Sequence, residues 1–365
     1  MTPTLLRALG IETPIIQAPM AGVSTPAMAA AVSNAGALGS LGLGATNAEG
    51  ARRMIRETRA LTAKPFNVNL FTHAPARRDP LRERNWLTWL TPQFEALGAA
   101  PPASIEEIYT SFRVDEAMLA MLIEERPAVV SLHFGLPPAP AIAALRQAGI
   151  VLLASATSVH EGQLIADAGI DAIIAQGAEA GGHRGVFDPE APDAELGTLA
   201  LTRLLVRDSS LPVIAAGGIM DGAGIAAVLA LGAQAAQLGT AFVASTESAI
   251  DEGYRRALLQ GTGETVFTST ISGRKARSLR NRFTALDADP HRPPAPDYPI
   301  AYDAGKSLHA AGKARGEFGF GAQWAGQAAG LARALPAGEL VRELKAELET
   351  ALSNLVVPQR PRQRG

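Results

Sequence analysis

One histidine stands among glycines directly after an apolar segment, in the run QGAEAGGHRG at residues 176–185. Residues 171–175 before it are typical of a buried strand. Glycines after a strand let the backbone approach a bound group, and the ordinary pKa of imidazole suits proton transfer near neutral pH. The pattern therefore predicts that His183 faces a ligand. A lone histidine in a loop is more often merely solvated, so the neighbouring segments must decide.

A second set of glycines follows two other apolar runs. Residues 212–216 lead into Gly217-Gly218, and residues 235–238 lead into Gly239-Thr240. Backbone N–H groups after two neighbouring strands, beside a helix N-terminus, can bind a phosphate without a lysine. Tight turns alone would not explain why both loops carry glycine at a strand end. Residues 222–227 also fit the dinucleotide pattern G-x-G-x-x-A, but they begin a helix, and no acidic residue follows the next strand to bind a ribose.

Eight short apolar runs alternate with alanine-rich helical segments between residues 13 and 261. The expected strands are residues 14–18, 38–43, 66–71, 128–133, 151–154, 172–176, 212–216 and 235–238, and the expected helices are residues 25–35, 47–62, 115–125, 139–148, 158–168, 198–206, 222–231 and 247–259. This alternation predicts an α/β fold, a (β/α)8 TIM barrel, with a doubly wound sheet as the alternative. Polar and glycine residues collect where the runs end, as in the active sites of barrels, which favours the barrel.

Two long interruptions divide the chain. We expect a barrel over residues 1–264 with an insertion at 72–114, a lid subdomain over 265–335, and a closing helix with a flexible tail over 336–365. Insertions of this length commonly build a lid or a binding surface. Leu340, Leu344, Leu348 and Leu352 recur at helical spacing, which predicts that the closing helix packs on the barrel.

Composition excludes several classes of function. The chain has 365 residues, 47% hydrophobic and 19% charged, with no cysteine and a net charge of -2. Disulfides, thiolate nucleophiles, cysteine-bound zinc and iron–sulfur clusters are therefore excluded, and no spacing of acidic residues or histidines indicates a metal site. The chain offers no overall field for nucleic acid or an anionic membrane. The basic residues between 274 and 282 are more typical of a solvated or lid-anchoring surface, and the absence of a signal segment favours a cytoplasmic protein.

Several segments, in order along the chain, resemble the nitronate monooxygenases, formerly called 2-nitropropane dioxygenases. They are residues 19–25, 31–36, 66–70, 130–137, 176–185 and 215–240. The segment around His133 and the pair Gly273-Arg274 are similar to the class I branch of that family. The resemblance implies FMN-dependent oxidation of alkyl nitronates, propionate 3-nitronate above all, by dioxygen to a carbonyl compound and nitrite.

The resemblance also implies roles for individual residues. FMN would lie across the strand ends with its phosphate after the last two strands, and His183 would be the active-site base or hydrogen-bond partner. The implied FMN contacts are Ala18, Pro19, Met20, Asn69, Gln176, Gly181, Gly182, Gly217, Gly218, Gln237, Leu238, Gly239 and Thr240, and the implied substrate residues are His133, Tyr109, Tyr254, Tyr298, Tyr302 and Lys306. Lys306 would be the counter-ion for a substrate carboxylate. The expected partners are a small anionic nitronate and O2, with neither nucleic acid nor membrane, for a monomer or homodimer.

Two alternative functions stay open at this point. Relatives on the same scaffold accept hydride, so an NAD(P)H-dependent flavin quinone or enoyl reductase is one alternative, and a non-catalytic flavin- or phosphate-binding module is the other. A buried histidine beside an anionic ligand is expected to retain its proton more readily, so we expect activity to depend on pH near neutrality.

Overall fold

The computed structural model describes residues 4–356, and the tail expected beyond them lies outside the described residues. Eight parallel strands form one sheet in the order β1-β9-β8-β6-β5-β4-β3-β2. They are β1 (Ile15–Gln17), β2 (Gly39–Gly42), β3 (Phe66–Phe71), β4 (Val129–His133), β5 (Val151–Ala156), β6 (Ala172–Gln176), β8 (Val213–Ala216) and β9 (Ala235–Leu238). A parallel bridge between Ile16 and Leu38 joins β1 to β2 and closes the sheet into a barrel. The predicted (β/α)8 barrel is confirmed, and the doubly wound alternative is excluded.

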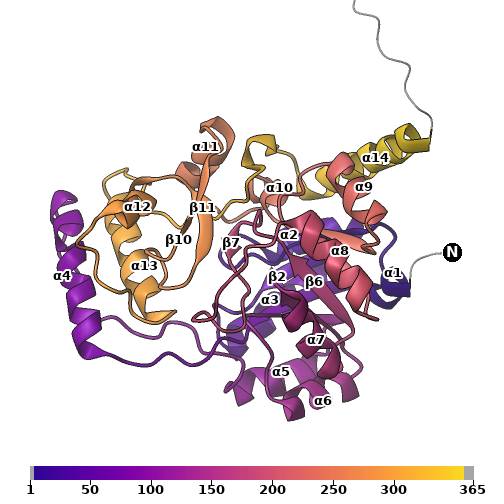
Figure 1. Ribbon diagram of the computed structural model, residues 1–365, viewed down its shortest axis with the longest axis horizontal. Helices are drawn as coiled ribbons and strands as arrows, with labels where there is room; N and C mark the ends of the chain where they lie inside the picture. The colour runs from indigo at the N-terminus through magenta and orange to yellow at the C-terminus, as the bar shows by residue number, and fades with distance from the viewer. Residues whose placement is uncertain (1–3, 357–365) are drawn as a thin grey trace, which may run out of the picture.

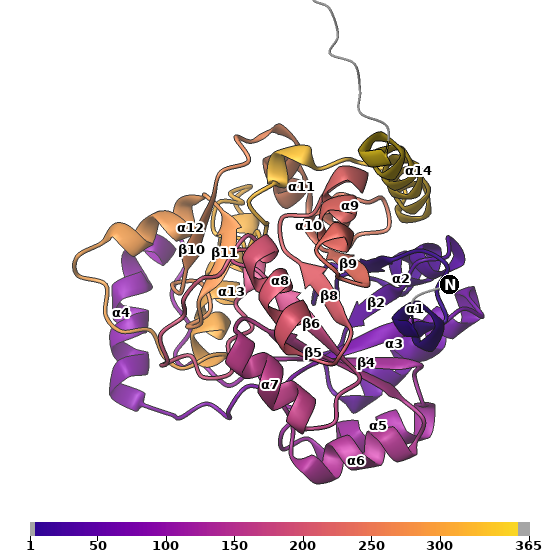
Figure 2. The same ribbon diagram turned by 45° about the vertical axis from the view of Figure 1, so that its right-hand side comes forward.

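Helices surround the barrel on its outer side (Figure 2). They are α2 (Pro26–Asn34), α3 (Ala48–Leu61), α5 (Glu116–Glu125), α6 (Ala139–Gln147), α7 (Val159–Asp167), α8 (Thr198–Asp208) and α9 (Gly222–Ala230), with α1 (Thr4–Leu9) before β1. The predicted boundaries agree within two residues. Side chains cap many of the helix starts: Asn47, Ser158 and Asp221, for example, each accept the backbone N–H of the residue three positions on.

The eighth predicted helix, residues 247–259, differs from the structure. After β9 the chain first forms a four-residue helix, α10 (Thr240–Val243), and only later α11 (Glu252–Gln260). The α11 helix begins at Glu252 because the side chain of Asp251 accepts the backbone N–H of Tyr254 and caps it. The apolar residues before Asp251 therefore belong to the turn between the two helices.

The two insertions form a layer of their own beside the barrel. Helix α4 (Pro80–Ala96) comes from the first insertion, and α12 (Arg282–Ala285), η1 (Leu286–Ala288) and α13 (Ile300–Lys313) come from the second. Figure 1 shows α4 and α13 together, away from the barrel helices. Trp86 and Phe94 of α4 are buried in one apolar cluster with Ile300 and Leu308 of α13. The hydrophobic effect therefore packs together two segments that are more than 200 residues apart in the chain.

A small antiparallel sheet connects this layer to the barrel. It has the order β10-β11-β7, with β10 (Thr265–Thr268), β11 (Ala276–Leu279) and β7 (Gly182–His183). Ala276 pairs with His183, and Arg277 pairs with Gly182. The glycine-rich segment after β6 thus contributes a short strand, so the prediction that His183 lies in a loop was wrong.

The chain ends its described part with η2 (Ala329–Leu331) and α14 (Ala337–Val356). Leu340, Leu344 and Leu348 are buried against α9 and α2, as the helical spacing predicted, whereas Leu352 is exposed. In the described residues, no helix combines the length and the hydropathy that a membrane crossing requires. No group of three or more acidic residues or histidines in this part of the chain is arranged to bind a metal ion.

Candidate active site

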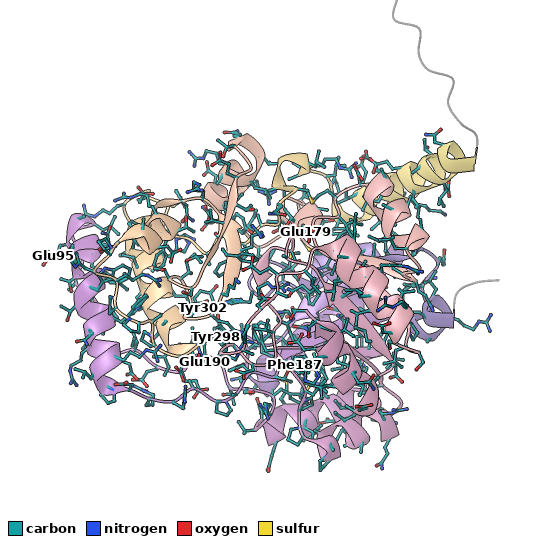
Figure 3. The ribbon with its side chains drawn as sticks, viewed as in Figure 1. Glu95, Glu179, Phe187, Glu190, Tyr298 and Tyr302 are labelled. Atoms are coloured by element: carbon teal, nitrogen blue, oxygen red, sulfur yellow. The ribbon has the colours of Figure 1, made fainter. Side chains whose placement is uncertain are left out.

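A cavity of about 1300 Å³, including the open space at its mouth, lies at the carboxyl ends of the barrel strands. The predicted site residues that line it are Ala18, Pro19, Met20, Asn69, Tyr109, His133, Gln176, Gly181, Gly182, His183, Gly217, Gly218, Gln237, Gly239, Thr240, Tyr254, Tyr298 and Tyr302. Figure 3 shows Tyr298 and Tyr302 on the side of the cavity where the layer of α13 meets the barrel.

Two predicted residues have their side chains outside the cavity wall. Leu238 is 1% exposed and packs in the core between β9 and its covering helices, while its carbonyl accepts the N–H of Ala18. Lys306 is exposed on α13, with its ammonium 4.9 Å from the ring centre of Tyr109 and 5.4 Å from that of Tyr302. Both rings line the cavity, so the ammonium lies behind them as a cation–π partner.

The backbone of His183 is held by two side chains from the barrel. Its carbonyl accepts the side-chain amide of Gln176 at 2.9 Å and the Nε2–H of His133 at 3.2 Å. The other end of the Gln176 amide accepts the N–H of Gly185, and Nδ1 of His133 lies 3.0 Å from the hydroxyl of Ser155. The polar atoms of His133 and Gln176 therefore already have protein partners, and both side chains fix the position of β7.

Aromatic rings enclose the imidazole of His183. The ring centre of Trp324 lies 5.0 Å away, that of Tyr298 5.1 Å, and that of Phe134 5.7 Å. Its Nε2 atom lies 2.8 Å from the hydroxyl of Ser272. The rings exclude water from around the imidazole, which strengthens every electrostatic interaction there.

This environment lowers the pKa of His183 well below 6.5, first through burial and then through the positive charge of Arg274. Arg274 is 6% exposed, and its guanidinium lies 4.1 Å from the ring centre of Phe134. Burial likewise lowers the pKa of His133 to about 4 and that of His73 to about 4. The three imidazoles are therefore neutral at pH 7 in the free protein. The expectation that an anionic ligand helps His183 to retain its proton concerns the liganded protein and stays a prediction.

The pH dependence of activity follows from this shift. Above pH 6.5 the imidazole of His183 has already lost its proton, so a further rise in pH changes nothing at this ring. With a preformed nitronate as substrate, we expect kcat/KM to stay level from about pH 6.5 to about pH 8 and to fall only at lower pH. Stopped-flow assays across this range, with enzyme stability checked at each pH, test the prediction. A midpoint at or above pH 6.5 would contradict it.

The cavity wall around β8 and β9 fits a phosphate-bearing cofactor. Gly217 and Gly218 have φ angles of 128° and 68°, and a Cβ at Gly217 would lie 2.6 Å from the hydroxyl of Thr198. Only glycine fits there, which exposes backbone amides to the cavity. The side-chain oxygen of Gln237 is buried in this wall without a hydrogen-bond partner among the described residues. Such an orphaned acceptor indicates that a bound group donates a hydrogen bond to it.

Three residues of the site were not among those that the sequence singled out. Ser272, Phe134 and Trp324 surround His183, but Ser272 is 89 residues away from it in the chain. The positions of these three residues in the sequence follow no motif or period that would predict their contact with His183. The pairing of β7 with β11 is what brings the turn at residues 272–274 against the imidazole.

Comparison with known proteins places the chain in a family. A sequence model described as nitronate monooxygenase matches residues 2–347. A nitronate monooxygenase of Paraburkholderia phytofirmans is 67% identical over 352 residues, 96% of each chain. One of Pseudomonas aeruginosa is 57% identical over 349 residues, 95% of this chain and 99% of its own.

Solved structures agree with this assignment. Nitroalkane oxidase from Streptomyces ansochromogenes has a TM-score of 0.88 at 40% identity, covering 96% of this chain and 100% of its own. FabK from Thermotoga maritima has a lower TM-score of 0.74 at 30% identity, covering 98% of this chain and 99% of its own. The chain belongs to the nitronate monooxygenase family.

Proposed function

We propose that the protein is an FMN-dependent monooxygenase that oxidises alkyl nitronates with dioxygen, giving a carbonyl compound and nitrite, with propionate 3-nitronate as its preferred substrate. The observation that carries the proposal is the neutral imidazole of His183, enclosed by aromatic rings in a cavity that ends in glycine loops. Nitronate monooxygenase is also the name of the relatives from Paraburkholderia phytofirmans and Pseudomonas aeruginosa.

The cofactor in this proposal is FMN. Its phosphate would bind the backbone after β8 and β9, at Gly217-Gly218 and Gly239-Thr240, and its ring system would contact residues 18–20. The orphaned oxygen of Gln237 supports this position, because the flavin ring carries an N–H donor. When bound, FMN supplies the electron acceptor that the oxidation of a nitronate requires.

The tyrosines are proposed as hydrogen-bond donors for the substrate. Burial raises the pKa of Tyr302 to about 12 and raises that of Tyr298 well above 10, so both hydroxyls keep their protons at neutral pH. The hydroxyl of Tyr298 is buried without a partner among the described residues, which leaves it free to donate to a nitronate oxygen. Tyr254 differs, because its hydroxyl donates to the carbonyl of Trp324 and so supports the cavity wall.

We also propose that residues 265–335 act as the lid of the site. They contribute Tyr298, Tyr302 and Trp324 to the cavity, and Tyr109 comes from the first insertion beneath α13. Closing the cavity with aromatic side chains excludes water from the reacting groups. The lid boundaries at residues 265 and 335 follow from the sequence and stay a proposal.

The visible spectrum of the purified protein and its anaerobic reduction test the function. A flavin spectrum that is bleached quickly by propionate 3-nitronate, but not by NADH, supports the proposal. Rapid bleaching by NADH alone would favour the alternative, an NAD(P)H-dependent flavin reductase. A colourless protein that takes up no FMN would overturn both.

Replacement of Lys306 by methionine tests the proposed carboxylate contact. Its ammonium lies behind the rings of Tyr109 and Tyr302, close enough to attract an anionic group at the mouth of the cavity. We expect KM for propionate 3-nitronate to rise roughly five- to tenfold, since the lysine is exposed and partly screened. KM for a nitronate without a carboxylate is expected to stay the same, as is KM for either substrate in Lys345→Met, which removes an exposed lysine of α14. An unchanged KM in Lys306→Met would disprove the role.

A further inference from the structure

The hydroxyl of Ser272 occupies the space between the imidazole of His183 and the backbone of Arg274. Ser272 is fully buried, and its Oγ lies 2.8 Å from Nε2 of His183. The same oxygen lies 3.1 Å from the carbonyl oxygen of Arg274 and 3.4 Å from the backbone nitrogen of that residue. One hydroxyl thus faces two groups that can accept its proton: the carbonyl and the unprotonated form of Nε2.

A count of protons decides between these two acceptors. A serine hydroxyl has one proton to donate, and a backbone carbonyl can only accept. If Ser272 donated to His183, the buried carbonyl of Arg274 would lose this hydrogen bond. The free-energy penalty of leaving a buried acceptor unsatisfied is larger than the net free energy gained from the bond to His183. Ser272 therefore donates to Arg274, and Nε2 of His183 must carry the proton that it donates to Ser272.

The neutral state of the ring completes the argument. The charged and titratable groups that face His183 are Arg274, His133, His73, Tyr298 and Tyr302. The guanidinium of Arg274 opposes a second positive charge, and both histidines and both tyrosines are neutral at pH 7. A neutral imidazole has one proton, so with Nε2 protonated the Nδ1 atom keeps a bare lone pair.

The turn that carries Ser272 cannot move away easily. Gly273 between the serine and the arginine has a φ of 82°, and a Cβ there would lie 2.3 Å from the carbonyl oxygen of Pro296 and 3.3 Å from the nitrogen of Tyr298. The turn is thus packed against the segment that brings Tyr298 into the cavity. The Ser272 hydroxyl is held in place by both its backbone and its hydrogen bonds.

We propose that Ser272 is a positioning residue that holds His183 as the Nε2–H tautomer, with the lone pair of the ring on Nδ1. The use of that lone pair in turnover rests on the proposed function, whereas the tautomer itself does not. The bond to Ser272 also fixes the direction of the ring, as a second hydrogen bond does for ligating histidines. Sequence spacing gives no hint of it, because the histidine belongs to the barrel segment between β6 and β8, whereas the serine belongs to the second insertion, 89 residues further along the chain.

Nitrogen-15 NMR of the histidine side chains tests the tautomer without any turnover. In the flavin-loaded protein labelled at histidine, and assigned with His183→Asn, we expect the His183 ring to show a protonated Nε2 and an unprotonated Nδ1. In Ser272→Ala we expect a mixture of tautomers or an exchange-broadened signal. Ser245→Ala is the matched control, since Ser245 is also fully buried and its hydroxyl has no partner among the described residues. A protonated Nδ1 in the unmodified protein would overturn the proposal.

Kinetics of the same variants test the functional consequence. We expect kcat with a nitronate to fall roughly tenfold in Ser272→Ala, about the worth of one buried hydrogen bond, with KM little changed. The kcat of the nearly isosteric Ser272→Cys variant, whose thiol is a weaker hydrogen-bond partner, is expected to lie between that of the unmodified protein and that of Ser272→Ala. A protein with the predicted tautomer but no nitronate turnover would refute the proposed function and leave the tautomer standing. Wild-type kcat in Ser272→Ala, despite mixed tautomers, would refute the positioning role.

Discussion

Replacement of His183 by asparagine lowers kcat with nitronates by about 10²- to 10⁴-fold, the range that a positioned general acid–base group contributes. Asparagine keeps a polar side chain of similar reach but loses the imidazole ring, which can exchange a proton with the reacting groups. The strand is expected to survive, because its anchors are the backbone carbonyl of residue 183 and the pairing with Ala276. Flavin is expected to stay bound, since the proposed phosphate contacts lie on β8 and β9.

The measurement is kcat together with the flavin absorbance of the same preparation. His160→Asn is the control, because His160 lies exposed on α7, outside the cavity. If the His183 variant is purified without flavin, the separation between proton transfer and cofactor binding is wrong. If it retains flavin and more than about a tenth of its activity, the proposed catalytic role of the imidazole is wrong.

Replacement of Asp193 by alanine lowers the free energy of unfolding by about 3–5 kcal/mol. The guanidinium of Arg184 is 1% exposed and bonds both carboxylate oxygens of Asp193 at 2.9 Å, as well as the carbonyl of Gln176 at 2.9 Å. Without the carboxylate, a buried positive charge is left unpaired next to His183. Activity is therefore expected to fall as well, because the same guanidinium fixes the segment between β6 and β7.

Urea denaturation monitored by circular dichroism measures this change, and Glu264→Ala supplies the contrast. Glu264 pairs with Arg280, but both side chains are more than 60% exposed, so the expected loss is only about 0–1 kcal/mol. An equal decrease in the free energy of unfolding in the two variants would mean that burial does not determine how much these ion pairs stabilise the protein. A small loss in Asp193→Ala would mean that water reaches Arg184 and replaces the carboxylate.

The barrel could be predicted because its pattern is local. Residues 66–71 form a strand with the predicted bounds, since Phe66, Val68 and Leu70 recur at the two-residue period of a strand. Strand β7 could not be predicted, because two residues carry no period and the pairing partner is more than 90 residues away. Helix α4 was treated as part of an irregular insertion, and Pro92 within it weakens any helical signal.

The cavity residues divide in the same way. Asn69 lies in the carboxyl-terminal half of β3, Gln176 ends β6 and Gly218 follows β8, so the barrel alone predicts that they meet. Phe134 also follows a strand, β4, but a phenylalanine there indicates no chemistry, and Ser272 reaches His183 only through the pairing of β7 with β11. The basic residues after Gly273 show what the sequence alone does not reveal. Arg274 and Arg277 are buried, whereas Arg280 and Arg282 are exposed, and nothing in the composition of this segment distinguishes the two pairs.

The three-stranded sheet has a consequence for how substrates enter and leave. Strand β7 belongs to the barrel segment and β11 to the covering layer, and beyond their paired residues the N–H of Arg184 donates to Lys275 and the guanidinium of Arg277 to Ala178. A cover that swung open as a rigid flap would break this ladder and displace His183 itself. The covering layer is thus hydrogen-bonded to the barrel segment next to His183. We therefore expect substrates to pass by rotation of side chains at the mouth of the cavity rather than by a hinge motion of the covering layer.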